Sequence, residues 1–240
     1  MVESDIKLDE NNTFQFTCKL CGNCCKQMLI RLTPFDIINL AGYLDMKTYD
    51  FINDYVVFLK TPNVSWLIAA LKHVRRGECM FKQGKKCKVH ENRPLPCRLF
   101  PVGRKENEFL LHKTSYCKGL NSNTNYTLSK WLEESKARPF LEMSQEFYTF
   151  MKKISDNYNL DDLDPKREKI FYKLLYDYDS ASLESTINLV KPLDKTKFSM
   201  RMTEWFLEYT LKVKELSDDD FLIAYEKQAL QEEKKLLLQS

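Results

Sequence analysis

The chain has 240 residues and a mass of 28.5 kDa, with 43% hydrophobic and 30% charged residues. This balance is that of a globular protein large enough to bury a core, and it excludes a disordered chain. The longest uninterrupted apolar run, at residues 66–71, is far shorter than the roughly 20 residues needed to span a bilayer, so no membrane helix is expected.

The amino terminus, MVESDIKLDENN, carries five charges and has no apolar core, which argues against a secretory signal. We therefore expect a cytoplasmic protein. Reducing conditions in the cytosol disfavour disulfides, so the eight cysteines indicate metal ligation rather than a disulfide framework.

Cysteine placement and charge divide the chain at about residue 120. All the cysteines lie between residues 18 and 117. Residues 1–120 hold 19 Lys+Arg and 12 Asp+Glu, a net charge of +7, whereas residues 121–240 hold 18 and 22, a net charge of −4. We predict a metal-binding cysteine-cluster module over 1–120, with a helical region over 121–240 packed on it.

The first half is predicted to begin with one strand and two helical segments. Residues 14–16 alternate apolar and polar side chains just before the first cysteine and are expected to form the strand. Thr33 and Pro34 supply a cap and a proline at the first helical position, which predicts a helix over 34–44. Apolar residues at helical spacing over 49–59 indicate a second helix, and a shorter apolar segment follows at 66–71.

The second group of cysteines is predicted to lie on a hairpin and a loop. Residues 79–81 and 87–89 flank Gln83-Gly84, so they are expected to pair with one cysteine on each arm. The segment ENRPLPCRLFP holds three prolines and is expected to be a stiff, irregular loop that fixes the position of Cys97. Another strand is predicted at 109–111.

From about Thr127 onward the pattern is helical. Apolar stripes over 140–154, 170–178 and 198–216 predict three helices, the second capped by Asp164-Pro165. Ser217 with Asp220 resembles a capping box that opens a last helix toward Leu238. We expect these stripes to be packing core and not a cofactor pocket. The predicted fold class is α+β, mainly α, with helices packed beside a small irregular cysteine module that contains β-structure.

The spacing of the cysteines predicts a metal site. Four fall within the stretch CKLCGNCCK, and four more stand singly farther along the chain. Thiolates ligate zinc and iron–sulfur clusters, and two-residue steps let neighbouring sulfurs converge on one ion or cluster. The layout differs from that of a zinc ribbon, which uses two C-x-x-C pairs. In addition, successive side chains in extended backbone point to opposite sides, and Cys24 and Cys25 are adjacent. We therefore expect two centres or one larger cluster, and spacing alone does not assign cysteines between them.

Nine basic residues between Lys72 and Arg98, against two acidic ones, surround the later cysteines. Two four-thiolate sites would carry a charge of about −4, so we expect this stretch mainly to compensate that charge or to bind a small anion. A solvated face is the next alternative. The chain has no recognition helix or RNA-binding motif, which argues against nucleic acid as a partner.

The histidines and the known catalytic motifs contribute little. His90 lies three residues after Cys87, but eight thiols leave no position that requires it, so we expect it outside the ligand set. His73 and His112 are expected to be structural. No G-x-S-x-G, Walker or G-x-G-x-x-G motif occurs, which argues against serine-hydrolase, P-loop and Rossmann functions.

Three segments, FTCKLCGNCCK, CMFKQGKKCKVHENRPLPCRLFPV and CKG, occur in this order over roughly residues 14–120. Together they resemble the YkgJ-type cysteine-cluster family, a zinc- or iron-chelating domain with the signature C-x-x-C-x-x-C-C. The resemblance implies that Arg93 and Arg98 are cofactor-binding groups beside the ligands. It also implies that the metal ligands are Cys18, Cys21, Cys24, Cys25, Cys79, Cys87, Cys97 and Cys117. His90 stands where relatives often carry tyrosine, which weakens any catalytic role there.

Three functional hypotheses follow. The first is a cytosolic metal-binding protein with an iron–sulfur centre, of the 4Fe-4S type, held by the clustered cysteines. The second is a structural zinc-binding interaction module. The third is a cluster-dependent protein-lysine methyltransferase, because a similar branch of the family includes flagellin lysine N-methylase, although no methyl-donor site is recognisable here. The helical region is expected to shape access or dock a protein partner. The sequence assigns no catalytic residue and no substrate.

Overall fold

The computed structural model describes residues 5–9, 12–62, 64–74, 77–105, 108–181, 191–213 and 218–238. Its internal contacts divide the chain into two compact units. Unit one contains Met1–Leu32 and Ala70–Glu142, and unit two contains Thr33–Ala69 and Met143–Ser240. Helices predominate and the sheets are small and antiparallel, which confirms the α+β class. The division of the sequence at residue 120 stays a prediction.

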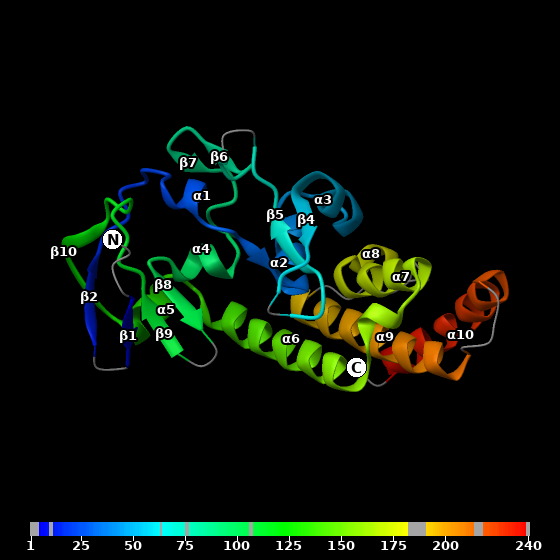
Figure 1. Ribbon diagram of the computed structural model, residues 1–240. Coiled ribbons are helices and arrows are strands. Elements are labelled where there is room, and N and C mark those ends of the chain that lie inside the picture. The colour runs from blue at the N-terminus through cyan, green and yellow to red at the C-terminus, as the bar shows by residue number, and fades with distance from the viewer. Residues whose placement is uncertain are drawn as a thin grey trace. The chain divides into compact units, whose positions relative to one another are not determined.

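Unit one contains small sheets that join segments far apart in the chain (Figure 1). β1 (Ile6–Leu8) pairs with β9 (Glu108–Leu111), which pairs with β8 (Val102–Lys105). β2 (Thr13–Phe16) pairs with β10 (Leu120–Thr127), and a bulge interrupts the register between Leu120 and Asn125. The strands predicted at 14–16 and 109–111 are confirmed. β10 was missed because its sequence, LNSNTNYT, lacks the alternation of apolar and polar residues that marks a half-buried strand.

An aromatic cluster forms the core beneath β2 and β10. Phe14 and Phe16 are buried, and the ring of Phe16 meets Trp131 edge-on at 5.3 Å between centroids. Tyr126 lies 5.2 Å from the same indole. The Trp131 Nε1–H donates to the Leu99 carbonyl at 2.7 Å, which satisfies the polar atom of a largely apolar side chain. This cluster holds α5 (Leu128–Glu134) against the sheet.

The elements of unit one that carry or flank the cysteines are short, and two predictions for them are corrected. Cysteines lie on α1 (Cys24–Gln27), β7 (Lys86–Cys87) and α4 (Leu95–Leu99), and the other two short elements are β3 (Arg31–Leu32) and β6 (Lys82–Gln83). The hairpin is only two residues long on each arm, so Cys87 lies on an arm and Cys79 precedes the other. The proline-rich segment is not an irregular loop, because Pro94 caps α4 and Pro96 stands in its first turn, where no backbone N–H is required.

The first part of unit two follows the predicted pattern up to residue 55. α2 (Pro34–Tyr43) confirms the predicted helix, and α3 (Thr48–Tyr55) follows it. The helical pattern predicted through residue 59 is wrong beyond Tyr55. β4 (Val56–Leu59) takes its place, because β-branched and aromatic side chains pack well on a sheet, and β5 (Ile68–Leu71) lies beside it.

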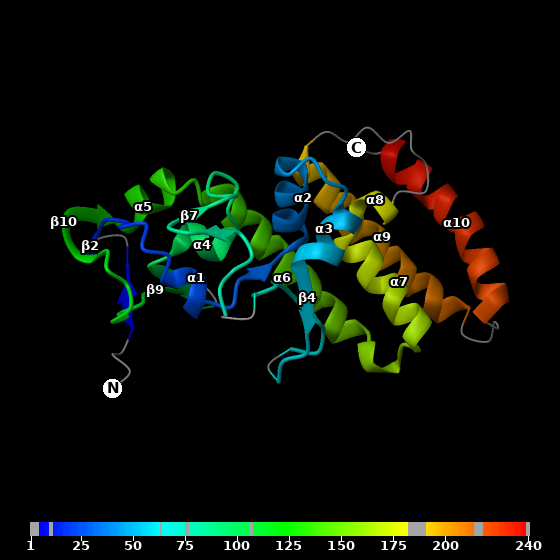
Figure 2. The ribbon, with the colours of Figure 1, turned by 90° about the horizontal axis from the view of Figure 1, so that it is seen from above.

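Figure 2 shows the remaining helices of unit two, and the apolar stripes predicted for them are largely buried. The first is α6 (Arg138–Asn157), whose first residues belong to unit one. The others are a short 3-10 helix (Leu160–Asp162), α7 (Pro165–Tyr176), α8 (Tyr178–Ala181), α9 (Pro192–Lys212) and α10 (Asp218–Leu238). Asp164 accepts hydrogen bonds from two backbone N–H groups of α7 and confirms the predicted cap. Ser217, the predicted cap of α10, lies outside the described residues.

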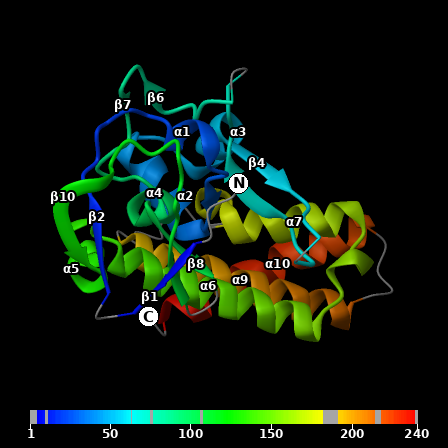
Figure 3. The ribbon, with the colours of Figure 1, turned by 60° about the vertical axis from the view of Figure 1, so that its left-hand side comes forward.

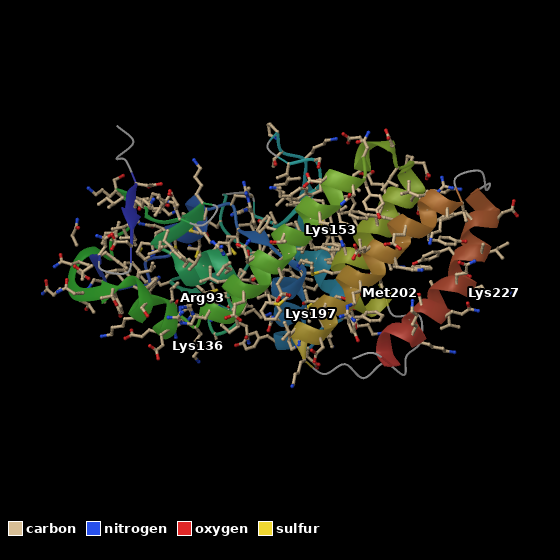
Figure 4. All side chains as sticks on the ribbon, turned by 90° about the horizontal axis from the view of Figure 1, so that it is seen from below. Arg93, Lys136, Lys153, Lys197, Met202 and Lys227 are labelled. Atoms are coloured by element: carbon tan, nitrogen blue, oxygen red, sulfur yellow. The ribbon has the colours of Figure 1, made fainter. Side chains whose placement is uncertain are left out.

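Ion pairs connect α6 with α9 on the solvent side of this helical packing. Lys153 pairs with Glu204, and Lys197 pairs with Glu146 at 3.7 Å. Figure 4 labels both lysines, together with Met202 of α9, which is completely buried. The apolar stripes are therefore packing core, as predicted. No helix in the described ranges combines the length and the apolar character needed to cross a membrane.

The cap of α2 gives a testable prediction for the stability of unit two. Thr33 Oγ1 accepts from the Asp36 backbone N–H at 3.2 Å, and the Asp36 carboxylate accepts from the Thr33 N–H at 2.8 Å, both in buried surroundings. Replacing Thr33 by alanine is expected to lower the free energy of unfolding by about 1–2 kcal/mol. The Asp36 backbone N–H would lose its acceptor, and the Asp36 carboxylate would lose the hydrogen bond that the Thr33 hydroxyl donates at 2.7 Å. Urea denaturation measures the change. Thr33→Ser, which keeps the hydroxyl, should lose less than half as much, and equal losses would contradict the assignment.

Candidate metal centre

Every predicted cysteine ligand lies in unit one. Cys18 and Cys21 stand in the loop between β2 and α1, Cys24 and Cys25 open α1, and Cys79 lies just before β6. The others are on β7, on α4 and in the loop before β10: Cys87, Cys97 and Cys117. All eight are free thiols, of which Cys79 is buried and Cys18 exposed. The fold thus brings together cysteines that are separated in sequence by the first part of unit two.

Backbone hydrogen bonds join Cys25, Cys79 and Cys87. The Cys79 N–H donates to the Cys25 carbonyl at 2.8 Å. The Cys79 carbonyl accepts from the Lys82 N–H at 3.0 Å, and Lys82 is paired with Cys87 across the hairpin. In the ribbon views, α1, the β6–β7 hairpin and α4, which carries Cys97, lie side by side (Figures 1 and 3). The segments of these four cysteines therefore form one neighbourhood.

The thiols of this neighbourhood influence one another electrostatically. Burial raises the pKa of Cys97 well above its usual value, and the charges of Cys79, Cys25 and Cys87 raise it further. Burial also raises the pKa of Cys79 to about 11, with contributions from Cys25 and Cys87. The pKa of Cys87 is raised by burial and then by Cys25. All six pairs among the four thiols interact, which means that negative charge gathered here needs compensation.

Cys24 and Cys25 form a coupled pair at the start of α1. Their mutual hydrogen bond lowers the pKa of Cys25 to about 7, and Lys82 lowers it as well. The same contact raises the pKa of Cys24, and the charges of Cys25, Cys97 and Cys18 add to this effect. Cys25 is therefore the more acidic thiol of the two.

A second set of contacts brings Cys117 to the first cysteine loop. The Thr17 N–H donates to the Gly119 carbonyl at 2.9 Å, which places the residue before Cys18 beside the segment of Cys117. The Asn23 side-chain amide donates to the Tyr116 carbonyl at 2.8 Å. Burial raises the pKa of Tyr116, and the charges of Cys24 and Cys117 raise it further. Both ends of the Cys18–Cys24 loop are thus tied to the loop that carries Cys117.

Basic side chains stand beside the thiols, as the charge pattern predicted. Lys82 forms a 3.0 Å ion pair with Glu78, which also binds Lys26 at 2.8 Å. Gly22 has φ +69°, and a Cβ there would lie 2.7 Å from Lys82 Cε, so the cysteine loop packs closely on this lysine. The positive charge of Arg93 lowers the pKa of Cys87 and of Cys97. The family resemblance placed Arg93 beside the ligands, but the sequence did not distinguish Lys82 from the other basic residues.

Arg98 and Arg93 differ in their surroundings. Arg98 is 3% exposed, donates to the carbonyls of Ser135 and Glu91 at 3.2 and 2.8 Å, and stacks over the Phe140 ring at 4.1 Å. Arg93 donates to the His90 carbonyl at 2.7 Å in exposed surroundings and is labelled in Figure 4. Arg98 thus anchors α4, which carries Cys97. A cofactor-binding role for either arginine stays a prediction.

The thiols are neighbours without a closed coordination shell. In the part of the chain that the structure describes, no three His, Cys, Asp or Glu side chains converge closely enough to hold a single metal ion. The donor set nevertheless fits soft metals, because free thiols from several segments, with positive charge beside them, suit zinc and iron–sulfur clusters. The ligand assignment of the eight cysteines therefore stays a prediction.

Comparison with known proteins finds a family to which part of this chain is similar. Residues 17–118 match the CxxCxxCC family, described as "Putative zinc- or iron-chelating domain". The uncharacterized protein MJ0661 of Methanocaldococcus jannaschii is 34% identical over 129 residues, which cover 50% of this chain and 66% of that protein, just under two thirds of its length. No solved structure matches. The predicted family resemblance is confirmed over residues 17–118.

Proposed function

Because residues 17–118 match a family described as a "Putative zinc- or iron-chelating domain", we propose that this protein carries an iron–sulfur centre of the 4Fe-4S type, held by its clustered cysteines. The carrying observation is the set of backbone contacts that joins the segments of Cys25, Cys79 and Cys87. The Cys79 N–H donates to the Cys25 carbonyl, and Lys82, whose N–H donates to the Cys79 carbonyl, is paired with Cys87 across the hairpin. When bound, such a centre would supply one-electron chemistry.

The layout of the cysteines in the sequence favours a cluster over a zinc ribbon. Zinc ribbons draw two C-x-x-C pairs into one tetrahedron, whereas here four cysteines fall within CKLCGNCCK and the other four stand singly.

The charges around the thiols support a four-thiolate centre, whether of zinc or of iron and sulfide. A 4Fe-4S centre in its 2+ state with four thiolates has a net charge of about −2, which the surroundings have to compensate. Lys82 acts on Cys25, and Arg93 acts on Cys87 and Cys97. We place this chemistry in the cytoplasm, where free thiols stay reduced, and we propose that the helical region binds a protein partner.

The proposal predicts a coloured protein when the chain is purified without oxygen. We expect a broad absorption band near 400 nm, as thiolate-ligated iron–sulfur clusters show, together with iron and acid-labile sulfide in equal amounts. Elemental analysis and sulfide quantification measure both. A matched sample purified in air, then reconstituted with iron and sulfide, controls for loss of the cluster.

The same measurements separate the alternatives. A colourless protein that holds zinc and takes up no iron on reconstitution would contradict the iron–sulfur proposal and favour the structural zinc module. A protein that holds neither metal in any preparation would contradict the chelating function itself.

A further inference from the structure

Resting on the proposed function, we propose that the first cysteine loop and the β6–β7 hairpin form a docking surface for an acidic electron-carrier protein. The loop spans residues 17–23 and the hairpin residues 82–88, and both belong to unit one. Their surface combines unpaired positive charges with an exposed apolar side chain. It also carries three of the predicted ligands, so a docked carrier would stand beside the candidate metal centre: Cys18, Cys21 and Cys87.

Close contacts make the loop and the hairpin one continuous surface. A Cβ at Gly22 would lie 2.7 Å from Lys82 Cε and 3.9 Å from the Gly84 carbonyl oxygen, so the loop backbone rests directly on the hairpin. The Glu78 carboxylate adds a second connection, because it binds Lys26 of α1 at 2.8 Å and Lys82 at 3.0 Å. The two segments therefore present their exposed side chains as neighbours.

Lysines dominate the charge of this surface. Residues 82–88 hold four lysines and no acidic residue. The charge of Lys82 is compensated by its ion pair with Glu78. Unpaired positive charge on a surface attracts an acidic partner and speeds its association by about 10- to 1000-fold. Within the described ranges, the remaining lysines of the surface are exposed and have no ion-pair partner: Lys19 in the loop, and Lys85, Lys86 and Lys88 in the hairpin.

Leu20, in the middle of the cysteine loop, supplies an apolar anchor. Its side chain is 51% exposed, and its backbone has φ +50°, in the left-handed region that is unfavourable for a leucine. The fold thus holds this leucine in a strained conformation and gains little burial from it. Protein interfaces commonly combine an apolar anchor with a charged rim, and Leu20 between the lysines has this arrangement.

The composition of the surface favours an acidic protein over a nucleic acid. Its basic residues are all lysines, whereas recognition of phosphates and bases relies largely on the planar guanidinium group of arginine. Residues 17–23 and 82–88 also contain no aromatic side chain on which a base could stack. Electron carriers bind through small interfaces, and a surface made of two short segments is of that kind.

Binding kinetics test the proposal, with a plant-type ferredoxin as the acidic probe and the basic protein cytochrome c as its counterpart. Lys19→Glu/Lys85→Glu is expected to slow ferredoxin association at least about tenfold at low ionic strength, because these charges attract the partner before contact. Leu20→Ser should instead speed dissociation about tenfold with little change in association, because an anchor acts after contact. Surface plasmon resonance measures both rates. For the wild type, which needs no variant, association should slow as salt is added.

Unit two supplies matched controls at exposed positions. Lys212→Glu/Lys227→Glu makes the same change in net charge, and Leu211→Ser replaces a leucine that is 47% exposed, so both should bind ferredoxin like the wild type. Equal slowing by the control pair would overturn the docking surface. So would a wild type that binds cytochrome c as tightly as ferredoxin, or that binds neither.

Two further measurements separate the remaining explanations. A single-stranded oligonucleotide that binds more tightly than ferredoxin, and is lost in Lys19→Glu/Lys85→Glu, would overturn the proposal in favour of nucleic acid. Iron, sulfide and circular dichroism are measured on every sample, so that a binding defect is counted only in a folded, metal-loaded variant. Ferredoxin binding by a wild type that takes up no iron would overturn the proposed function and leave the docking surface in place.

Discussion

Replacing Gly119 by alanine is expected to destabilise unit one by about 3 kcal/mol and to reduce its metal content. A Cβ at this position would lie 2.5 Å from the Thr17 carbonyl oxygen and 2.8 Å from Phe16 Cε2. The first atom belongs to the backbone, so the strand must shift, and overpacking of this kind costs about 1–3 kcal/mol or more. The shift also breaks the bond between Thr17 and Gly119 that ties the Cys117 loop to Cys18. Urea denaturation and metal analysis measure the two effects.

Gly42 provides the matched control for this substitution. It lies in the last turn of the α2 helix in unit two, and a Cβ there would meet nothing within 4 Å. Gly42→Ala is expected to change stability by less than about 1 kcal/mol, in the stabilising direction, and to leave the metal content unchanged. Equal behaviour of the two variants would show that the close approach of Gly119 to β2 has no energetic consequence.

Replacing Arg98 by methionine is expected to cost about 3 kcal/mol of stability and to loosen the segment that carries Cys97. The substitution keeps a long, unbranched apolar side chain but removes the guanidinium group. The hydrogen bonds to the carbonyls of Ser135 and Glu91 and the contact of the guanidinium with the Phe140 ring are therefore lost. Hydrogen bonds from charged donors contribute about 1.5–3 kcal/mol each, and buried carbonyls without a donor add to the loss. The measurements are chemical denaturation and hydrogen exchange of the α4 amides, which should become faster.

Two further variants distinguish the anchoring role of Arg98 from a simple effect of charge. Arg93→Met removes one positive charge from the same segment, but its hydrogen bond to His90 is exposed, so a loss of about 0.5 kcal/mol is expected. Arg98→Lys keeps the positive charge but loses the planar guanidinium group that donates to two carbonyls, so it should be little more stable than Arg98→Met. Full rescue by lysine would argue that charge alone matters at this position.

Local side-chain chemistry made several elements of this fold predictable. Thr33, Thr127 and Asp164 each accept a hydrogen bond from the backbone N–H groups that follow them, so the starts of α2, α5 and α7 are specified within a few residues. The apolar stripes of α6 and α9 were equally clear, because helical spacing is visible over many residues. These elements depend little on what lies far away in sequence.

The elements that were missed depend on partners far away in sequence or on competing signals. β10 pairs with β2 through backbone groups while its own side chains are polar, so no hydrophobic pattern marks it. The prolines around Cys97 indicated an irregular loop, yet their positions at the start of α4 suit a helix. The helical pattern over 49–59 gave way to a strand at Val56 because tertiary packing overrides a weak local preference.

The candidate site was predictable in its chemistry but not in its arrangement. Eight cysteines and an excess of basic residues predicted sulfur ligands with charge compensation. That Cys79 binds the backbone of Cys25, and that Asn23 binds the backbone of Tyr116, depends on contacts between distant segments that spacing does not encode. Lys82 likewise became distinct from the other basic residues only in three dimensions.

The interruption of unit one has a consequence for how the protein is made. The chain leaves this unit after residue 32 and returns to it at residue 70, so Cys25 is synthesised long before Cys79, Cys87 and Cys97. On the ribosome, the early thiols emerge without the partners to which the folded protein joins them. Metal delivery to a nascent chain would therefore meet an incomplete set of donors, and productive loading has to wait until translation has passed the last of them.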